Sequence, residues 1–378
     1  MTKHLVFVGG GHVHLTALLS LRDYLQAGHR VTLIGPAPYH YYSGMGPGLL
    51  SGIYRPADVR FHVRKMAEDR GAEFLEDRVV RVDPARRTLS LASGGEVRYD
   101  VVSFNTGSGV PADLIDPSAD DVYPVKPIEN LLAARRKIWD TPGGKRFRAV
   151  VVGGGAAGVE IAANLGRLGK ESGRIDGITL VSRSIVLEDY PAKGRAFALR
   201  SLDRWGIRWI EEASVTSVGH GVVRLGNGTG LEADMIFVAV GVKPSPLFRD
   251  SGLPTGKDGG LLVNECLQSV RHPELFGGGD CISLEGTPLA RVGVYAVRQN
   301  RILHRNLLAF LEGRAPGRFD PGGAYLTILN MGDGRGIFRR KEFVWDGPLA
   351  FRLKDAIDRR FMRKFQVSGE RRESLRGE

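Results

Sequence analysis

The sequence predicts an α/β protein with two Rossmann-like dinucleotide-binding domains and a smaller C-terminal domain that carries an amphipathic helix. Two glycine-rich loops, about 140 residues apart, each follow a short apolar run: HLVFVGGGHVHL at 4–15 and RAVVVGGGAAGVEIA at 148–162. A strand that turns through glycines into a helix presents backbone N–H groups to a pyrophosphate. One βαβ unit of about 30 residues cannot contain both loops. We therefore expect two bound dinucleotides.

The first domain is expected to begin with a strand at 4–8, a helix at 12–27 and a strand at 30–34. Alternation of strand and helix patterns over the first 310 residues favours doubly wound layers. A glycine-rich aromatic loop, PYHYYSGMGPGLLSG, follows at 38–52. A small antiparallel insert is then predicted from short strands near 73–75, 79–82, 88–91 and 96–99, before a strand at 100–104.

Residues 147–240 repeat this order, with a strand at 178–181 and a helix at 192–205. This internal duplication sets the expected domain limits. The first dinucleotide domain takes 1–112 and, after the chain returns, 251–315; the second takes 113–250; and the C-terminal domain takes 316–378.

The two loops differ at the third glycine position. Gly153, Gly155 and Gly158 complete the second loop, whereas the first has Gly9, Gly11 and then His14. That position normally takes Gly or Ala so that the helix can pack closely on the strand. We therefore expect His14 to point aside or the helix to stand off.

Composition excludes several classes of protein. Cys266 and Cys281 are the only cysteines and show no metal-ligand spacing, so we expect no disulfide framework and no metal site. No basic-then-apolar leader and no apolar run of about 20 residues are present, which favours a cytoplasmic protein. The net charge is +11, but no nucleic-acid reading motif accompanies it.

The positive charge is concentrated near the C-terminus. Residues 335–365 hold ten Lys and Arg against four Asp and Glu. Within them an apolar stripe recurs every four residues, at Leu353, Ile357, Phe361 and Phe365. A basic amphipathic helix of this kind suits the anionic inner face of a membrane, where the protein would be peripheral. The alternative is a helix that packs on its own domain and leaves a solvated basic face.

Three further motifs follow along the chain: VVSFNTGSGVP at 101–111, MIFVAVGVKPS at 235–245 and LFGGGDCI at 275–282. With the two loops they resemble the pyridine nucleotide–disulfide oxidoreductases. YYSGMGPG, GVYAVRQNRILHRNL and LAFRLKDAIDRRFMRKF are similar to type II NADH:quinone oxidoreductases and to the oxidoreductase module fused to selenide, water dikinase in some proteins.

The resemblance implies FAD on the first domain and NAD(P)H as substrate on the second. Asp280 would contact the flavin ribityl chain, and the other implied FAD contacts are Gly9, Gly11, His12, Gly44, Pro47, Thr106 and Gly107. The implied nucleotide contacts are Gly153, Gly155, Gly158, Arg183 and Gly241. Glu160 would lie where nicotinamide meets flavin, and Gln299 would face the acceptor. An exposed helical Glu and a helix without quinone specificity are the simpler interpretations of these two residues.

Two departures from the family pattern concern the adenosine ribose. Gly35 occupies the position of the usual acid in the first domain, and Ser182 followed by Arg183 occupies it in the second. Arg183 favours a 2′-phosphate and hence NADPH, although loss of nucleotide binding would leave the same pattern.

A flavin enzyme that reduces disulfides needs two thiols at the flavin, and we interpret both cysteines as small buried hydrophobes. The expected function is therefore electron transfer from NAD(P)H through FAD to a quinone-like acceptor at a membrane surface. A soluble flavin reductase linked to selenium or sulfur metabolism and a flavin-binding scaffold without turnover remain alternatives. The oligomeric state stays open, with a homodimer as one arrangement.

Overall fold

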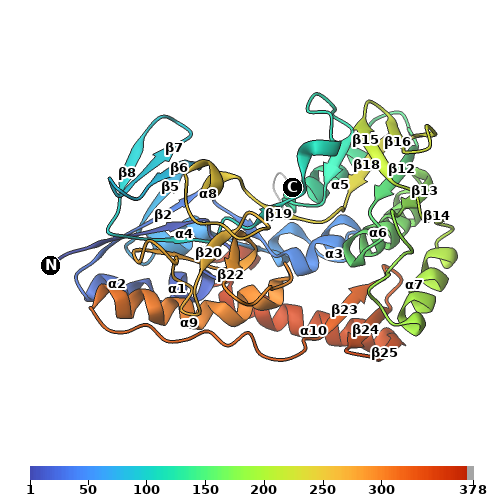
Figure 1. The fold of residues 1–378 in the computed structure, drawn as a ribbon. Helices are drawn as coiled ribbons and strands as arrows, with labels where there is room; N and C mark the ends of the chain where they lie inside the picture. The colour runs from blue at the N-terminus through green and yellow to red at the C-terminus, as the bar shows by residue number, and fades with distance from the viewer. Residues whose placement is uncertain (373–378) are drawn as a thin grey trace.

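A computed structural model describes residues 1–372; residues 373–378, the end of the expected C-terminal domain, lie outside the described part. Two five-stranded parallel sheets organise the chain (Figure 1). The first has the order β21-β9-β1-β2-β5 and the second β11-β18-β12-β13-β14. This confirms the predicted α/β fold with two Rossmann-like sheets.

The strands of the first sheet are β1 (His4–Val8), β2 (Arg30–Gly35), β5 (Glu73–Glu76), β9 (Val101–Phe104) and β21 (Leu275–Gly277). Those of the second are β11 (Val122–Pro124), β12 (Phe147–Val152), β13 (Ile175–Val181), β14 (Arg208–Ile210) and β18 (Met235–Val238). Because β21 pairs with β9, the chain returns to the first sheet after it has completed the second. The strands β9 and β18 are buried throughout, as expected for parallel sheets with helices on both faces.

The helix after the first glycine loop differs from the prediction. The expected helix at 12–27 is two short helices, α1 (Leu15–Leu19) and α2 (Leu21–Gln26). His14 explains the late start, because its buried ring bonds through Nδ1 to the Gly9 carbonyl oxygen (2.6 Å) and through Nε2 to Ser103 Oγ (2.8 Å). The His14 side chain thus points aside, as expected, and the helix begins at the next residue, Leu15.

The second glycine loop follows the standard pattern. Helix α6 (Ala156–Ser172) begins directly after Gly155, and α7 (Ala192–Arg204) matches the helix predicted at 192–205 to within one residue. A Cβ at Gly158 would collide with the carbonyl oxygen of Gly153, so only glycine allows α6 to lie this close to the loop.

The antiparallel insert of the first unit contains three strands, β6 (Val79–Asp83), β7 (Thr88–Leu91) and β8 (Glu96–Arg98). The strand predicted at 73–75 belongs instead to the parallel sheet, as β5. It pairs in parallel with β2, in a register that runs from Thr32↔Glu73 to Gly35↔Glu76. The second unit has a matching insert, β15 (Val215–Gly219), β16 (Val222–Leu225) and β17 (Gly230–Glu232).

Shorter elements connect these layers. The helices are α3 (Gly46–Leu50), α4 (Val63–Glu68), α5 (Glu129–Asp140) and α8 (Leu247–Asp250). Paired short strands are β3 (His40–Tyr41) with β4 (Arg60–Phe61), β10 (Ser108–Gly109) with β19 (Lys243–Pro244), and β20 (Leu261–Val263) with β22 (Ile282–Leu284). The pair β10–β19 is antiparallel and joins the two segments that cross between the large sheets.

The elements from α9 (Gly293–Leu311) onward run along the lower side of the molecule in Figure 1. Helix α9 is followed by an antiparallel sheet of β23 (Thr327–Asn330), β24 (Gly336–Arg340) and β25 (Phe343–Gly347), and then by α10 (Pro348–Phe365). Within residues 1–372, no helix combines the length and the apolar character needed to cross a bilayer.

The predicted stripe on α10 does not face one way. Leu353 and Ile357 are 39% and 45% exposed, whereas Phe365 is buried. A step of four residues overshoots one helical turn by about 40°, so twelve residues rotate the stripe by about 120°. The buried face contains Ala350, Lys354, Asp358, Met362 and Phe365. The expectation of apolar residues on one side and cations on the other was therefore wrong for Lys354.

Candidate functional site

A large cleft opens at the carboxyl ends of the second sheet, the edge where doubly wound folds bind ligands. Its volume is about 1380 Å³. It brings together Gly153, Gly155, Arg183 and Gly241, which lie far apart in the sequence. A Cβ at Gly155 or Gly241 would meet no atom within 4 Å, so both backbones are open to a ligand. This geometry fits a dinucleotide.

The C-terminal sheet and α9 supply the opposite wall of the cleft. Tyr325 and Arg339 come from the C-terminal unit and Tyr295 from α9. The rings of Tyr295 and Tyr325 contact each other edge to face at 5.6 Å, and Arg339 lies 4.5 Å above the ring of Tyr190. Sequence reasoning missed this wall because nothing in the local sequence connects residues 295–341 with the loop at 153.

Glu160 lies on α6, two residues after Gly158, and is not an exposed helical glutamate. Its Oε1 accepts a hydrogen bond from the backbone N–H of Asn330 at 2.7 Å. Burial raises its pKa to about 7, although the positive charge of Lys354 and the bond from Asn330 act in the opposite direction. Burial also raises the pKa of Tyr190, which lines the cleft, and the Glu160 charge adds to that rise. Glu160 therefore lies close behind the cleft wall.

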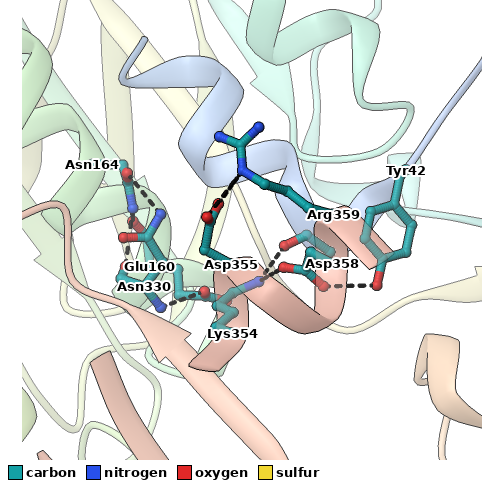
Figure 2. Close-up of polar contacts among 9 residues, drawn as sticks. Tyr42, Glu160, Asn164, Asn330, Lys354, Asp355, Asp358 and Arg359 are labelled. Carbon is teal, nitrogen blue, oxygen red and sulfur yellow. Dashed lines mark hydrogen bonds and ion pairs between the residues drawn. The ribbon is translucent and has the colours of Figure 1, made fainter. Parts of the chain in front are cut away.

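A buried amide network joins this helix to the rest of the molecule (Figure 2). Asn164 Nδ2 donates to the main-chain oxygen atoms of Glu160 (2.8 Å) and Asn330 (3.0 Å). Its Oδ1 accepts from Ser51 Oγ at 2.7 Å, and Ser51 ends α3. Because Asn330 belongs to β23, three units of the chain meet at one pair of asparagines.

Lys354 enters the same region from α10 (Figure 2). Its Nζ donates to the carbonyl oxygen of Gly44 and to Asp358 Oδ2, both at 2.6 Å. Tyr42 OH donates to Asp358 Oδ1 at 3.0 Å. Burial raises the pKa of Asp358 despite these partners. The glycine-rich loop of the first unit is thus attached to a buried ion pair on the last helix.

The glycines of that loop accommodate protein rings. A Cβ at Gly44 would lie 2.7 Å from the ring of Tyr42, and one at Gly48 would lie 2.5 Å from the ring of Tyr54. Pro47 occupies the first turn of α3, where a missing N–H costs nothing. The space beside Gly44, an implied FAD contact, is therefore filled by Tyr42.

Asn105 organises the first glycine loop and was missed from the sequence. Its Oδ1 accepts from the N–H of Val13 at 3.1 Å, and its Nδ2 donates to the carbonyl oxygen of Gly278 at 2.9 Å. A Cβ at Gly9 or Gly11 would collide with Asn105. The glycines of the first loop thus allow Asn105 to bridge it to the Asp280 loop. The sequence NTGSG at 105–109, directly after β9, was the signal that could have indicated Asn105.

His12 and His40 lie together beside this loop, with their rings 5.2 Å apart. The His12 ring stacks on Phe361 of α10 at 5.8 Å and lies 5.2 Å from Tyr42. Burial lowers the pKa of His12 to about 4 and that of His40 to about 3. Neither Nε2 atom has a hydrogen-bond partner within residues 1–372, although both are buried.

Asp280 forms a second polar cluster with Lys126 and Ser108. Its Oδ2 accepts from Lys126 Nζ at 2.7 Å and from Ser108 Oγ at 2.8 Å. Thr106 is exposed, and a Cβ at Gly107 would meet no atom within 4 Å. Two unpartnered imidazole nitrogens, an available carboxylate oxygen and an open glycine turn fit a polar cofactor such as FAD.

A carboxylate also lies beside the glycine that replaces the usual ribose acid. Gly35 ends β2 in register with Glu76 of β5, and Glu76 is paired with Arg64. This neighbouring strand offers an acid that β2 itself lacks.

Gln299 is buried, and its Oε1 accepts from the backbone N–H of Gly279 at 2.6 Å. Its carbonyl therefore supports the Asp280 loop. Cys281 is also buried, as we interpreted it, whereas Cys266 is only partly buried. Burial raises the pKa of both thiols. A protonated thiol is a poor nucleophile, which disfavours disulfide chemistry. No cluster of potential metal ligands occurs among the described residues.

Comparisons with known proteins identify the family. A family model described as pyridine nucleotide-disulphide oxidoreductase matches residues 3–300, so the chain belongs to this family. It is accordingly an FAD-dependent NAD(P)H oxidoreductase, which confirms the resemblance seen in the sequence.

Two relatives illustrate its range. The chain is 28% identical over 356 residues to ferroptosis suppressor protein 1 of Taeniopygia guttata, covering 88% of this chain and 87% of that one. It is 28% identical over 277 residues to the demethylphylloquinone reductase NdbB of Synechocystis, covering 70% and 66%. It spans 35% of a longer relative, the nitrite reductase [NAD(P)H] of Bacillus subtilis.

Solved structures share the fold. NDH2 from Plasmodium falciparum in complex with NADH superposes with a TM-score of 0.81 at 15% identity, with 97% of each chain covered. An engineered water-forming NADPH oxidase bound to NADPH gives a TM-score of 0.72 at 17% identity, covering 89% of this chain and 74% of that one.

Proposed function

We propose that the chain takes hydride from NADPH and passes the electrons through FAD to a quinone-like acceptor that arrives from a membrane surface. One observation carries this proposal: α10 has one face buried against the first unit and another face exposed to solvent. Lys354 on its buried face bonds to the Gly44 loop and acts on Glu160, while Leu349, Leu353 and Ile357 lie exposed on its outer side.

In this proposal Glu160 would supply a proton, and Lys354 would hold the Gly44 loop in position and act on the charge of Glu160. A quinone that accepts two electrons also takes up two protons. A carboxyl group with a pKa of about 7 is suited to give one near neutral pH. The bound FAD supplies the redox chemistry, for which Asp280, His12 and Gly107 offer contacts.

Nucleotide choice would rest on Arg183. Ser182, Arg183 and Ser184 directly follow β13 of the second sheet, and all three line the cleft. The engineered NADPH oxidase carries substitutions that replace consecutive aspartate, alanine and methionine by alanine, arginine and serine. A planar guanidinium matches a 2′-phosphate, and the absence of an acid removes a ribose partner that NADH would use.

The two cysteines, one relative and the exposed side chains of α10 support a quinone-like acceptor. Neither cysteine is activated, so electrons leave the flavin without a protein disulfide. NdbB is named as a reductase of a quinone. Exposed apolar side chains on α10, flanked by the exposed cations Arg352, Arg360 and Arg363, suit an anionic lipid surface.

Anaerobic mixing tests this function directly. The purified protein should carry FAD, and NADPH should bleach its visible absorbance. A short-chain quinone should then restore the colour, while an oxidised disulfide should not. A protein that binds FAD but is bleached by neither nucleotide, or is reoxidised only by the disulfide, would contradict the proposal.

A further inference from the structure

Lys126 occupies a position that the family resemblance did not indicate. It lies two residues after β11 of the second sheet, yet its Nζ is 2.7 Å from Asp280 Oδ2 and 3.3 Å from Ser108 Oγ. The Lys126 and Asp280 side chains are 27% and 13% exposed. A residue from the second unit therefore bonds directly to Asp280, the carboxylate that the family resemblance assigns to the ribityl chain.

The charge of Lys126 also reaches the first glycine loop. Burial lowers the pKa of His12 and the Lys126 charge lowers it further. For the lowered pKa of His40 the causes are burial, then the charge of His12, then that of Lys126. Because Lys126 Nζ also bonds to Asp280, its charge acts on both the first glycine loop and the Asp280 turn. Among the described residues, two of its three N–H donors have partners, which leaves one donor for a ligand.

Two other cations, Arg291 and Lys354, already have carboxylate partners of their own. Arg291 donates through Nη2 to Asp258 at 2.7 Å and through Nε to the main-chain oxygen of Asp280 at 3.0 Å. Lys354 is paired with Asp358. Lys126 instead binds the carboxylate of Asp280, whose described side-chain bonds are all made by Oδ2, and Oδ1 is left for a hydroxyl group.

We propose that Lys126 is a positioning residue for the flavin: it orients Asp280 toward the ribityl chain and places a positive charge beside the ring that receives hydride. This inference rests on the proposed flavin contact of Asp280. Hydride transfer moves two electrons and one proton from the nicotinamide to a neutral ring, which leaves one negative charge there. A fixed cation stabilises that charge and so raises the reduction potential of the flavin.

Sulfite offers a readout that does not require turnover. Its sulfur lone pair forms a bond to N5 of oxidised flavin, and the added negative charge passes to the ring. Removing a neighbouring cation should weaken this adduct for the same electrostatic reason. The midpoint potential, measured by equilibration with reference dyes, gives an independent value.

The experiment compares Lys126→Met with Lys126→Arg, which keeps the charge, and with Lys137→Met as a control on α5. All are loaded with FAD before measurement. Lys126→Met should weaken sulfite binding at least tenfold. It should also make reduction of the flavin about tenfold less favourable, which for a two-electron couple is a midpoint potential lower by about 30 mV. Lys126→Arg should stay within about threefold of the wild type, and Lys137→Met should be unchanged.

Each outcome decides the inference. Wild-type potential and sulfite affinity in FAD-loaded Lys126→Met would overturn it and leave the flavin site itself intact. If that variant does not retain FAD, Lys126→Gln, which keeps a donor to Asp280 without the charge, is judged by the same criteria. A wild-type chain that binds no FAD would instead contradict the proposed function.

Discussion

Lys354 and Asp358 form an ion pair of 2.6 Å within α10, and both side chains are almost fully buried. The pair lies against the first unit, because Lys354 also bonds to Gly44 and Asp358 to Tyr42. A sequence pattern of alternating charge on a basic helix gives no hint that this lysine points inward.

Lys354→Met should be strongly destabilising, since it leaves the Asp358 carboxylate buried without its cation. Loss of one partner from a buried pair typically costs about 3–5 kcal/mol. Urea unfolding followed by tryptophan fluorescence should show a lower midpoint, largely restored in the double variant Lys354→Met, Asp358→Leu. Arg359→Met breaks an exposed pair on the same helix and serves as the control, with an expected cost of about 0.5 kcal/mol. Equal midpoints for Lys354→Met and Arg359→Met would contradict the prediction.

Glu160→Gln should change how stability depends on pH. The folded-state pKa of about 7 lies above the ordinary value of 4.5. Between these values the folded protein binds a proton that the unfolded chain has released, so wild-type stability falls as pH rises from about 4.5 to about 7. The variant lacks this loss and should be more stable than the wild type at pH 8, by up to about 3 kcal/mol. Near pH 5 the two should be similar.

Thermal unfolding at several pH values checks this prediction. Glu171→Gln, at an exposed position of the same helix, should follow the wild-type profile. A profile for Glu160→Gln parallel to that of the wild type would show that the carboxyl group titrates normally.

The fold was largely predictable from sequence, and the polar contacts were not. Apolar strands followed by glycines at 4–15 and 148–162 are local patterns, and each formed the expected strand and turn. Asn105, Lys126 and Asn330 act over sequence separations of 92, 154 and 166 residues, in bonds to Val13, Asp280 and Asn164. Such pairs depend on how the sheets are placed, which periodicity does not encode. The rotation of the α10 stripe was in principle predictable, because it follows from the helical repeat alone.

Arg183→Glu should shift nucleotide preference from NADPH toward NADH. A charge-assisted bond to the 2′-phosphate contributes about 1.5–3 kcal/mol, so the ratio of kcat/KM values should fall by roughly tenfold or more. Rapid flavin reduction with each nucleotide measures this ratio. Arg208→Glu makes the same charge change on β14, outside the cleft, and should leave it unaltered. Identical ratios in Arg183→Glu and Arg208→Glu would remove the basis for NADPH preference.

The exposed part of α10 should bind anionic vesicles. Leu353→Ser with Ile357→Ser should release the protein from phosphatidylserine-containing vesicles in a sedimentation assay, with flavin content retained. Binding of the wild type should weaken in 1 M salt, where the Debye length is about 3 Å. Val80→Ser with Val270→Ser alters two exposed apolar residues elsewhere and is the matched control. Phe361 and Phe365 are unsuitable for this test, because their rings pack on His12 and Phe61. Equal vesicle binding by both double variants would count against a membrane contact at this helix.

His14 shows how a broken motif is compensated. The residue fills the third glycine position of the first loop, where its ring links Gly9 to Ser103 and lies edge-on to Phe7 at 4.8 Å. A design that restored the usual glycine would empty this space and free two polar groups, so His14→Gly would weaken the loop that the consensus residue is meant to improve. Residues 9, 14 and 103 therefore have to be changed together. A motif search that scores the third glycine by itself will undervalue dinucleotide-binding loops in which a histidine makes these contacts.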